Sequence, residues 1–405
     1  MTRSNAPLVS VIIPAFNSRE WLAQAIDSAL SQTYPNIEIV VVNDGSTDLR
    51  TREIAHRYIP RITYIERENG GVAAARNTGV AASTGELIAL LDQDDVWLRH
   101  KLEVEVRAWL ARPHVSLVHS SYHILDGQKP STSAQRSRKQ LLKLREREYL
   151  PLPGLLIDVP ICSATTLFPR NILDEVGMFD PALNGTDDWD LWLRMAARGY
   201  TFYCVGEPLA EYRMHASNSS HNIDLMVGGV MRTLDKFYAL PSVPRSALRW
   251  QKRAYFKRHT WAASLYYGAG SLVNAQKHLQ TAARYLPHGI ATGRFLQSLV
   301  HANHQAGGPP PGEADIHKAS FFVRHALAQA RIPLSTRQAV ARRVITHKKL
   351  LLALHARRPL QLAATLLSDP TLIVDPELWA ALPRRISRLL QKILIRTIGR
   401  RPTPD

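Results

Sequence analysis

Four polar residues follow a short apolar run that reads as a buried strand, residues 87–91. The four are Asp92, Gln93, Asp94 and Asp95. Aspartates are hard oxygen ligands, and a pair at a strand end suits Mg²⁺ or Mn²⁺ shared with a diphosphate. An EF-hand is excluded, because Trp97 stands at the sixth loop position, where that motif needs glycine. The alternative is an acidic turn that caps a helix over residues 96–110.

A second acidic group, which includes Asp187 and Asp188, opens a predicted helix over residues 187–198. The ordinary explanation is that acids in a first helical turn interact favourably with the helix dipole. The chemical explanation is that the same dipole keeps a carboxylate ionised and able to act as a general base. The sequence pattern alone leaves both open.

Asp44, Arg76 and His215 complete the polar candidates. Asp44 lies in residues 43–48, which could equally be a turn followed by a helix cap. Arg76 stands on a helix of small residues, and its structural alternative is an ion pair with a nearby aspartate. His215 follows a predicted strand, where a lone histidine more often has a structural role than a ligand role. Neither a G-x-G-x-x-G fingerprint nor a P-loop lysine is present.

Strands and helices that alternate along the chain must position these side chains. Apolar runs predict strands at 8–13, 37–42, 62–65 and 87–91. Helices are predicted at 21–30, at 71–82, and in the segment that follows the turn at 43–46 and ends at residue 58. The alternation indicates right-handed βαβ units in a mostly parallel, Rossmann-like sheet. Ligands bind such sheets at the carboxyl ends of the strands, so we expect Asp44 and residues 14–17 and 92–95 along one edge.

The ordered segments together resemble glycosyltransferase family 2, the inverting enzymes with the GT-A fold, over about residues 7–220. The matching segments are VSVIIPAFN at 9–17, SALSQT at 28–33, VNDGSTD at 42–48, NGG at 69–71, ARNTG at 75–79, GELIALLDQDD at 85–95, VGMFD at 176–180, DDWDLWLR at 187–194 and YRMH at 212–215. The set is specific, although no single motif is.

The resemblance implies where the nucleotide part of a donor binds. The loop that would lie against the base consists of Pro14, Ala15, Phe16 and Asn17, with Phe16 where the family often has tyrosine. Asp44 would hydrogen-bond the base, and Arg76 would sit near the base or the diphosphate. Asp92 would meet the ribose or the donor sugar.

The resemblance also implies a metal and a base. Asp94 would bind a Mn²⁺ or Mg²⁺ ion that bridges the diphosphate, and His215 matches a further metal contact of some members. Asp188 matches the general base of the family's Glu-Asp motif. This sequence has Asp187 where the family usually has Glu, so Asp187 is the second candidate for the base.

Such residues fit an inverting, metal-dependent, hexosyltransferase-type reaction. The sugar–diphosphate bond breaks through an oxocarbenium-like state, the metal and Arg76 neutralise the leaving group, and Asp188 deprotonates the acceptor hydroxyl. We expect a nucleotide-diphosphate sugar as donor, UDP-linked, and a glycan or lipid-linked acceptor in cell-surface glycan or glycolipid synthesis. The alternatives are a metal-dependent nucleotidyltransferase and a degenerate transferase domain that serves as a basic helical scaffold.

The charge distribution divides the chain of 405 residues, whose formal net charge is +17. Residues 231–405 carry 28 Lys and Arg against 7 Asp and Glu, a balance of +21, which leaves −4 for residues 1–230. We therefore predict a catalytic domain at 1–230 and a basic α-helical domain at 231–405. The region between 126 and 153 reads as an exposed insertion with some helix at 139–148.

The basic part shows three features of organisation. Residues 255–286 resemble one tetratricopeptide-like helical hairpin, residues 307–312 are a Gly/Pro-rich linker, and helical patterns resume over 319–367. Residues 384–401 form an amphipathic basic pattern that favours an anionic membrane surface, or else a helix packed on its own domain. Nucleic acid is not expected as a partner, because the basic region has few interleaved aromatic residues and no binding motif.

Composition indicates the compartment. The two cysteines, Cys162 and Cys204, do not form a disulfide framework or a metal-ligand spacing. The N-terminal seven residues lack the pattern of a secretory signal, and no apolar run is long enough to span a membrane. We expect a cytoplasmic protein, peripheral on the inner face of the membrane.

Overall fold

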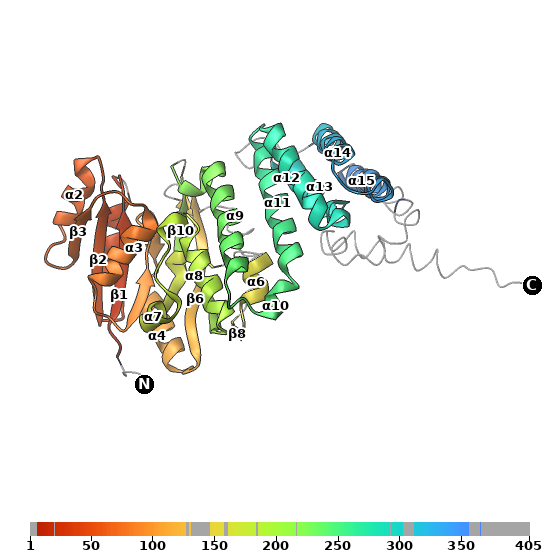
Figure 1. Cartoon of the computed structure of the whole chain (residues 1–405). Coiled ribbons are helices and arrows are strands. Elements are labelled where there is room, and N and C mark those ends of the chain that lie inside the picture. Colours follow the sequence, from red (N-terminus) through yellow and green to blue (C-terminus); the bar gives the residue numbers. More distant parts are fainter. Residues whose placement is uncertain are drawn as a thin grey trace, which may run out of the picture. The chain divides into compact units, whose positions relative to one another are not determined.

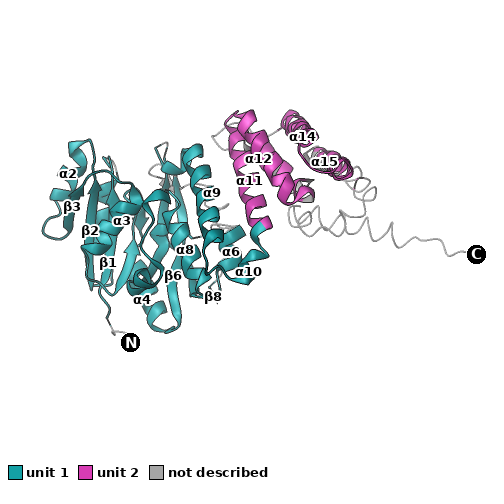
Figure 2. Cartoon of the chain, viewed as in Figure 1, with its two compact units in different colours: residues 1–251 teal, residues 252–405 magenta. Residues whose placement is uncertain are grey.

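A computed structural model describes residues 6–19, 21–126, 129–130, 146–157, 161–183, 185–215, 217–291, 293–302, 312–355 and 365. These residues divide into two compact units, 1–251 and 252–405 (Figure 2). The charge balance placed the boundary near residue 230. The helix that crosses this position, α9 (Ile223–Ala239), contacts the preceding elements of the first unit, including α8 (Asp187–Ala197), so the boundary falls 21 residues later.

The first unit is built on one mixed sheet (Figure 1). Its strands are β1 (Val9–Ala15), β2 (Ile37–Asp44), β3 (Thr63–Arg67), β4 (Leu87–Leu90), β5 (Val96–Trp97), β6 (Val115–Asp126), β7 (Lys129–Pro130), β8 (Arg147–Tyr149), β9 (Thr166–Pro169) and β10 (Thr201–Met214). The main order is β3-β2-β1-β4-β9-β6-β10-β5, with β7 on β6 and β8 on β10.

The predicted parallel arrangement is confirmed for the first half of the sheet and differs in the second. Strands β3, β2, β1 and β4 run parallel, as do β6 and β10. Strand β9 runs antiparallel between β4 and β6, and β5, β7 and β8 also pair antiparallel. The sheet is therefore parallel from β3 to β4 and mixed beyond β4.

The first unit also contains helices, and those at residues 22–30, 49–56, 72–81 and 187–197 lie where the sequence predicted helices. The helices are α1 (Leu22–Leu30), α2 (Leu49–His56), α3 (Val72–Ala81), α4 (Lys101–Leu110), α6 (Leu152–Ile157), α7 (Asn171–Val176), α8, α9 and α10 (Arg245–Leu248), with 3₁₀ turns at Ser163–Thr165, Pro181–Leu183 and Ser219–His221. Two expectations were wrong. Val96 and Trp97 pair with β10, so the helix after the acidic run begins at Lys101, and residues 147–149 form a strand instead of the end of a helix.

The strand order reverses between β1 and β4, and ligands bind open α/β sheets outside the strand ends at such a point. The chain moves outward from β1 to β2 and β3, and then returns through α3 to β4 on the other side of β1. Neighbouring strands that lead in opposite directions leave a crevice outside their carboxyl ends. The end of β1 with the residues after it, 14–17, and residues 92–95 after β4 therefore meet at this edge, where Phe16 N–H donates to Gln93.

The second unit is helical in the described residues, as predicted. It contains α11 (Gln251–Gly268), α12 (Leu272–Tyr285), the 3₁₀ turn Pro287–Ala291, α13 (Gly293–Ala302), α14 (Glu313–Ala328) and α15 (Leu334–His355). Helices α11 and α12 form the predicted hairpin, with Gly270 at a φ of +76° in the turn. Among the described residues, no helix is long and apolar enough to cross a membrane. The predicted linker at 307–312, apart from Gly312, and the amphipathic segment at 384–401 lie outside them.

Helix α3 approaches the sheet closely because Gly79 has no side chain. A Cβ at this position would lie 2.6 Å from Cγ2 of Ile12 on β1 and 3.3 Å from Cγ2 of Val42 on β2. Both contacts are with buried side chains in the core of the unit, so neither can swing away. The glycine therefore fixes the distance between α3 and the strands that carry the predicted site.

We predict that Gly79→Ala destabilises the first unit by about 1–3 kcal/mol, the usual cost of forcing an extra methyl group into a packed core. Urea unfolding followed by circular dichroism measures the change. Gly154→Ala is the matched control, because a Cβ there meets nothing within 4 Å and alanine favours the helix. Equal stability of Gly79→Ala and the wild type would show that α3 can move away from the sheet.

Candidate active site

Two loops at the ends of β1 and β2 are joined by Asn17. Its backbone φ is +49°, in the left-handed region that asparagine tolerates. Its side-chain Oδ1 accepts hydrogen bonds from the backbone N–H of Thr47 (2.9 Å) and of Asp48 (3.3 Å), and its own N–H donates to Oγ of Ser46 (2.9 Å). The predicted base-binding loop at 14–17 and the turn at 43–48 are therefore one rigid unit.

Asp44 is buried and accepts several hydrogen bonds. Its carboxylate receives the backbone N–H of Gly70 (3.1 Å) and of Gly71 (2.7 Å), and it forms an ion pair with Arg67. The pattern 43–48 also contains the predicted helix cap, since the Asp48 carboxylate accepts from the N–H of Thr51 at the start of α2. Arg67 was missed by the sequence analysis, because nothing in its local pattern connects it with Asp44.

The four-residue run after β4 sends each side chain to a different partner. Gln93 binds the backbone of Phe16 twice, as acceptor from N–H (2.7 Å) and as donor to C=O (3.2 Å). Asp92 accepts from Arg76 and from Oγ of Ser163 (2.8 Å). The amide pair keeps Phe16 in place, with its ring 42% exposed. Gln93 and Ser163 are further residues that the sequence reasoning did not assign.

Asp94 and His215 come together, although 121 positions separate them. Oδ2 of Asp94 lies 2.9 Å from Nε2 of His215, and Nδ1 of His215 lies 2.8 Å from Oγ of Ser217. When Nδ1–H donates to Ser217, the Nε2 lone pair is free to bind a cation. Burial raises the pKa of Asp94, nearby Asp92 raises it further, and His215 opposes the shift.

The last acid of the run, Asp95, binds the backbone of strand β10. It is 1% exposed and accepts the backbone N–H of Arg213 (2.9 Å). The Arg213 side chain donates to the Asp94 carbonyl oxygen (2.9 Å), and its guanidinium lies 4.1 Å from the ring centroid of Trp21. Burial raises the pKa of Asp95 well above its usual range, and Asp94 and Asp92 add to the shift. Strand β10 is thereby fixed beside the acidic run.

Asp94 and His215 are the two side chains of this region that could bind a divalent cation together. No group of three or more His, Cys, Asp and Glu side chains converges among the described residues. One carboxylate and one imidazole are therefore the donors that the described chain offers, and the other ligands would have to come from a bound diphosphate and water. An oxygen and a nitrogen donor together suit Mn²⁺ better than Mg²⁺, which prefers oxygen alone. The pair fits a cation held jointly with a ligand.

Arg76 connects the acidic run with helix α8. Its Nη2 donates to Oδ1 of Asp92 and its Nη1 donates to Oδ2 of Asp187, both at 2.7 Å. The Arg76 side chain is 4% exposed and Asp187 is 1% exposed. Burial by itself would lower the pKa of Arg76, but Asp187, Asp92 and Asp188 outweigh it and raise the pKa. The ion-pair alternative for Arg76 is confirmed, and direct contact with a nucleotide stays a prediction.

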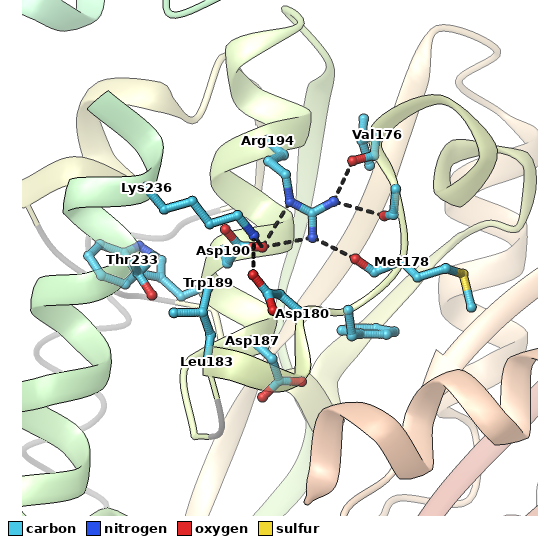
Figure 3. Close-up of polar contacts among 12 residues, drawn as sticks. Val176, Met178, Asp180, Leu183, Asp187, Trp189, Asp190, Arg194, Thr233 and Lys236 are labelled. Atoms are coloured by element: carbon cyan, nitrogen blue, oxygen red, sulfur yellow. Dashed lines mark hydrogen bonds and ion pairs between the residues drawn. The ribbon is translucent and has the colours of Figure 1, made fainter. Parts of the chain in front are cut away.

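A network of ion pairs connects α8 with the residues around it (Figure 3). Asp190 accepts from Nε of Arg194 at 2.8 Å and pairs with Lys236 of α9 at 3.0 Å, and Lys236 also pairs with Asp180 at 2.7 Å. Arg194 donates in addition to the carbonyl oxygens of residues 176, 177 and 178. The loop before α8, the helix itself and α9 are therefore bound into one assembly.

Asp188 differs from the other two acids of the first turn of α8. Asp187 is paired with Arg76 and Asp190 with Arg194 and Lys236, whereas Asp188 has no ion pair among the described residues and accepts one hydrogen bond, from the N–H of Trp189 (2.7 Å). Burial and the adjacent Asp187 raise the pKa of Asp188 to about 7, against the lowering effect of Arg76. A carboxylate with this pKa is suited to take a proton near neutral pH.

The site residues predicted from the sequence thus fall into three groups. The structure brings Asp92, Asp187 and Asp188 together around Arg76, and it brings Asp94 to His215. Asp44 and the 14–17 loop form the other end of the same edge. The carboxylate of Asp92 raises the pKa of both Asp94 and Asp188, so it acts electrostatically on both parts.

Known proteins are similar to this chain in sequence and in fold. Residues 10–177 match the model of "Glycosyl transferase family 2". An uncharacterized glycosyltransferase of Nostoc is 33% identical over 72% of this chain and 98% of that protein. The putative teichuronic acid biosynthesis glycosyltransferase TuaG of Bacillus subtilis is 31% identical over 53% of this chain and 82% of that protein. An uncharacterized Rickettsia prowazekii glycosyltransferase is 36% identical over 53% of this chain and 67% of that protein.

Two solved structures have a similar fold. Staphylococcus aureus TarS, crystallised with UDP-GlcNAc, matches with a TM-score of 0.54 and 15% identity over 85% of this chain and 91% of that chain. The Pyrobaculum calidifontis mannosyltransferase PcManGT, in complex with GDP-Man and Mn²⁺, matches with a TM-score of 0.50 and 21% identity over 85% of this chain and 87% of that chain. At these identities the likeness is one of fold, and it confirms the predicted GT-A architecture.

Proposed function

We propose that this chain, which belongs to glycosyltransferase family 2, transfers a sugar with inversion from a nucleotide-diphosphate donor to a hydroxyl acceptor. The observation that carries the proposal is the carboxylate of Asp188. It has a pKa of about 7 and no ion pair among the described residues, and Arg76 joins its neighbour Asp187 to Asp92. A base and a donor-facing carboxylate at this position are what an inverting displacement needs.

The nucleotide would be read at Asp44. Its carboxylate is an acceptor, which pairs with the N–H of uracil or guanine and repels the unprotonated ring nitrogens of adenine and cytosine. Each of its oxygens already accepts a backbone N–H, from Gly70 and Gly71. Uracil needs one acceptor for its ring N–H, whereas guanine needs two for its adjacent N–H groups. Because the Asp44 carboxylate already accepts from two backbone N–H groups and from Arg67, it can accept the single N–H of uracil more readily. Arg67 beside Asp44 can donate to a uracil carbonyl. We therefore favour UDP.

Asp94 and His215 would hold a divalent cation, with the other ligands supplied by the diphosphate and water. When bound, the ion would neutralise charge on the departing diphosphate. Ser217 orients His215 for this contact, and Arg213 holds the backbone of Asp94. Asp95 in turn holds the backbone of Arg213, which keeps the two ligands in register. The prediction of Mn²⁺ or Mg²⁺ becomes a preference for Mn²⁺.

Asp188 would act as the general base. It accepts the proton of the acceptor hydroxyl as the acceptor oxygen forms a bond to the anomeric carbon and the bond from that carbon to the diphosphate breaks. The products are an inverted glycoside, the free nucleoside diphosphate and protonated Asp188. Asp187 is the weaker candidate, because its Oδ2 is bound to Arg76 and its side chain is 1% exposed.

The acceptor would be a glycan or lipid-linked hydroxyl in cell-surface glycan synthesis, at the cytoplasmic face of a membrane. The support is the similarity to TuaG, whose name refers to teichuronic acid synthesis, and the basic composition after residue 230. A basic, amphipathic pattern at 384–401 would contact anionic lipid headgroups.

We predict that, of UDP, GDP, ADP and CDP, UDP raises the melting temperature most, and that Mn²⁺ increases this stabilisation. Asp94→Ala should abolish the metal-dependent part, because half of the protein's cation ligands are lost. Thermal shift with and without Mn²⁺ measures both effects. Stabilisation by ADP or CDP alone would contradict the role of Asp44, and no stabilisation by any of the four would favour the scaffold alternative.

We predict that Asp188→Asn lowers turnover by at least about 10²-fold, the lower range for loss of a general base, and leaves the Kd for UDP within about threefold. The amide keeps the shape of the side chain but cannot accept the proton. Release of nucleoside diphosphate from nucleotide sugars measures turnover, and calorimetry measures UDP binding. Release of pyrophosphate by the wild type would indicate the nucleotidyltransferase alternative. Collapse of UDP binding in Asp188→Asn would indicate a structural role.

We predict an acidic limb in the pH dependence of kcat, with a midpoint at about 7. A base must be ionised, so activity is complete above the pKa of Asp188 and falls tenfold per unit as the pH drops below it. Asp187→Asn removes a neighbouring negative charge that raises this pKa, so its midpoint should move to lower pH. An unchanged midpoint in Asp187→Asn would show that another group controls the limb.

A further inference from the structure

Arg76 is bound by protein on both sides. Its two terminal nitrogens each donate at 2.7 Å, one to Asp92 after strand β4 and one to Asp187 at the start of α8. These carboxylates lie 95 positions apart in the sequence, and Arg76 brings them together. Both terminal nitrogens are thereby engaged by carboxylates of the protein, and the side chain is 4% exposed.

The residue after Arg76 makes the same connection through the backbone. Nδ2 of Asn77 donates to the carbonyl of Phe179 (2.8 Å), and Oδ1 of Asn77 accepts the N–H of Phe179 (3.0 Å). The Phe179 ring centroid is 5.7 Å from Cζ of Arg76. Phe179 precedes Asp180, which joins the charge network of α8 and α9 (Figure 3). Two consecutive residues of α3 therefore hold both α8 and the loop before it.

The charges explain why the arginine is needed. Burial raises the pKa of Asp187 and of Asp188, Asp92 adds to both shifts, Asp187 adds to that of Asp188, and Arg76 opposes both. Without the guanidinium, Asp187 would be an uncompensated charge in the interior, which is strongly unfavourable. The first turn of α8 could relieve this repulsion only by moving away from Asp92 or by taking up a proton.

From these contacts we propose that Arg76 is a positioning residue that holds the first turn of α8, and so the Asp188 carboxylate, against the donor side of the site, instead of binding the nucleotide. The proposal rests on the proposed function, in which Asp188 is the base. Asp188 follows Asp187 directly, so a displacement of the ion pair displaces the base as well. A misplacement of about 1 Å at a reacting group costs about 10²-fold in rate.

The test compares Arg76→Gln with Arg67→Gln, the arginine paired with Asp44 at the nucleotide end. Calorimetry gives the Kd of UDP in Mn²⁺. Release of nucleoside diphosphate from UDP-glucose, UDP-galactose, UDP-N-acetylglucosamine or GDP-mannose, each assayed separately with water as the acceptor, gives kcat and KM for the donor that is cleaved. We expect Arg76→Gln to lower kcat about 10²-fold with Kd and KM within about threefold. We expect Arg67→Gln to raise Kd and KM.

Amide hydrogen exchange reports the position of the helix without a substrate. In Arg76→Gln, residues 186–191 should exchange faster than in the wild type, whereas residues 43–48 should not change. Loss of UDP affinity in Arg76→Gln equal to that in Arg67→Gln would overturn the proposal, as would unchanged exchange at 186–191. Absence of nucleoside diphosphate release by the wild type would sink the proposed function, and the binding and exchange results would still decide the role of Arg76.

Two further variants keep the result interpretable if Arg76→Gln folds poorly. The double variant Arg76→Gln/Asp187→Asn removes the orphaned charge, so it should regain thermal stability but not kcat. Arg76→Lys keeps a charge that can pair with one carboxylate at a time, so it should restore part of kcat. Full kcat in the double variant would overturn the proposal, because a correctly placed base would then not need the ion pair.

Discussion

The structure of the candidate site depends on one buried arginine, Arg76, which forms ion pairs with Asp92 and with Asp187 at 2.7 Å each. Arginine suits this position because its guanidinium is planar, keeps its charge when buried and presents donors in fixed directions. The contact joins the carboxyl end of a central strand to the first turn of a helix. Helix α3 can place Arg76 there because Gly79 lets it lie close to β1.

Around Arg76 and its two partners, most of the other acidic residues each bind a partner of their own. Asp44 takes Arg67 and two backbone amides, Asp94 takes His215, and Asp190 takes Arg194 and Lys236. Pairing on this scale reduces the repulsion among the carboxylates that gather in this region. Asp188 has no ion pair among the described acids of the first turn of α8, and burial together with the adjacent Asp187 raises its pKa. The chemistry of the site and its electrostatic stability thus have the same cause.

Many of the polar motif residues hold loops together. Asn17 and Gln93 bind backbone groups of the two loops beside the predicted nucleotide site, and Asn77 binds that of Phe179. Loops that carry function need a rigid scaffold, and side-chain amides supply it because each can donate and accept at once. The similarity of these motifs to a family therefore reflects the architecture of the loops as much as contacts with a ligand.

The sequence by itself determined the elements and the candidate residues. Apolar periodicity predicted strands β1 to β4, helices α1 to α3 and the start of α8, because these patterns are local. Motif order was sufficient to indicate the GT-A fold and to select Asp44, Asp92, Asp94 and Asp188 for roles that remain predictions.

The tertiary structure decided what each of those residues touches. Strand pairing beyond β4 was not predictable, because short strands such as β5 and β9 have no periodicity that fixes their direction. Nor does any local pattern connect Arg76 with Asp187 across 111 positions, Asp92 with Ser163, or Asp44 with Arg67. Ion pairs and hydrogen bonds depend on distances of a few ångströms in space, and the sequence specifies these only through the whole fold.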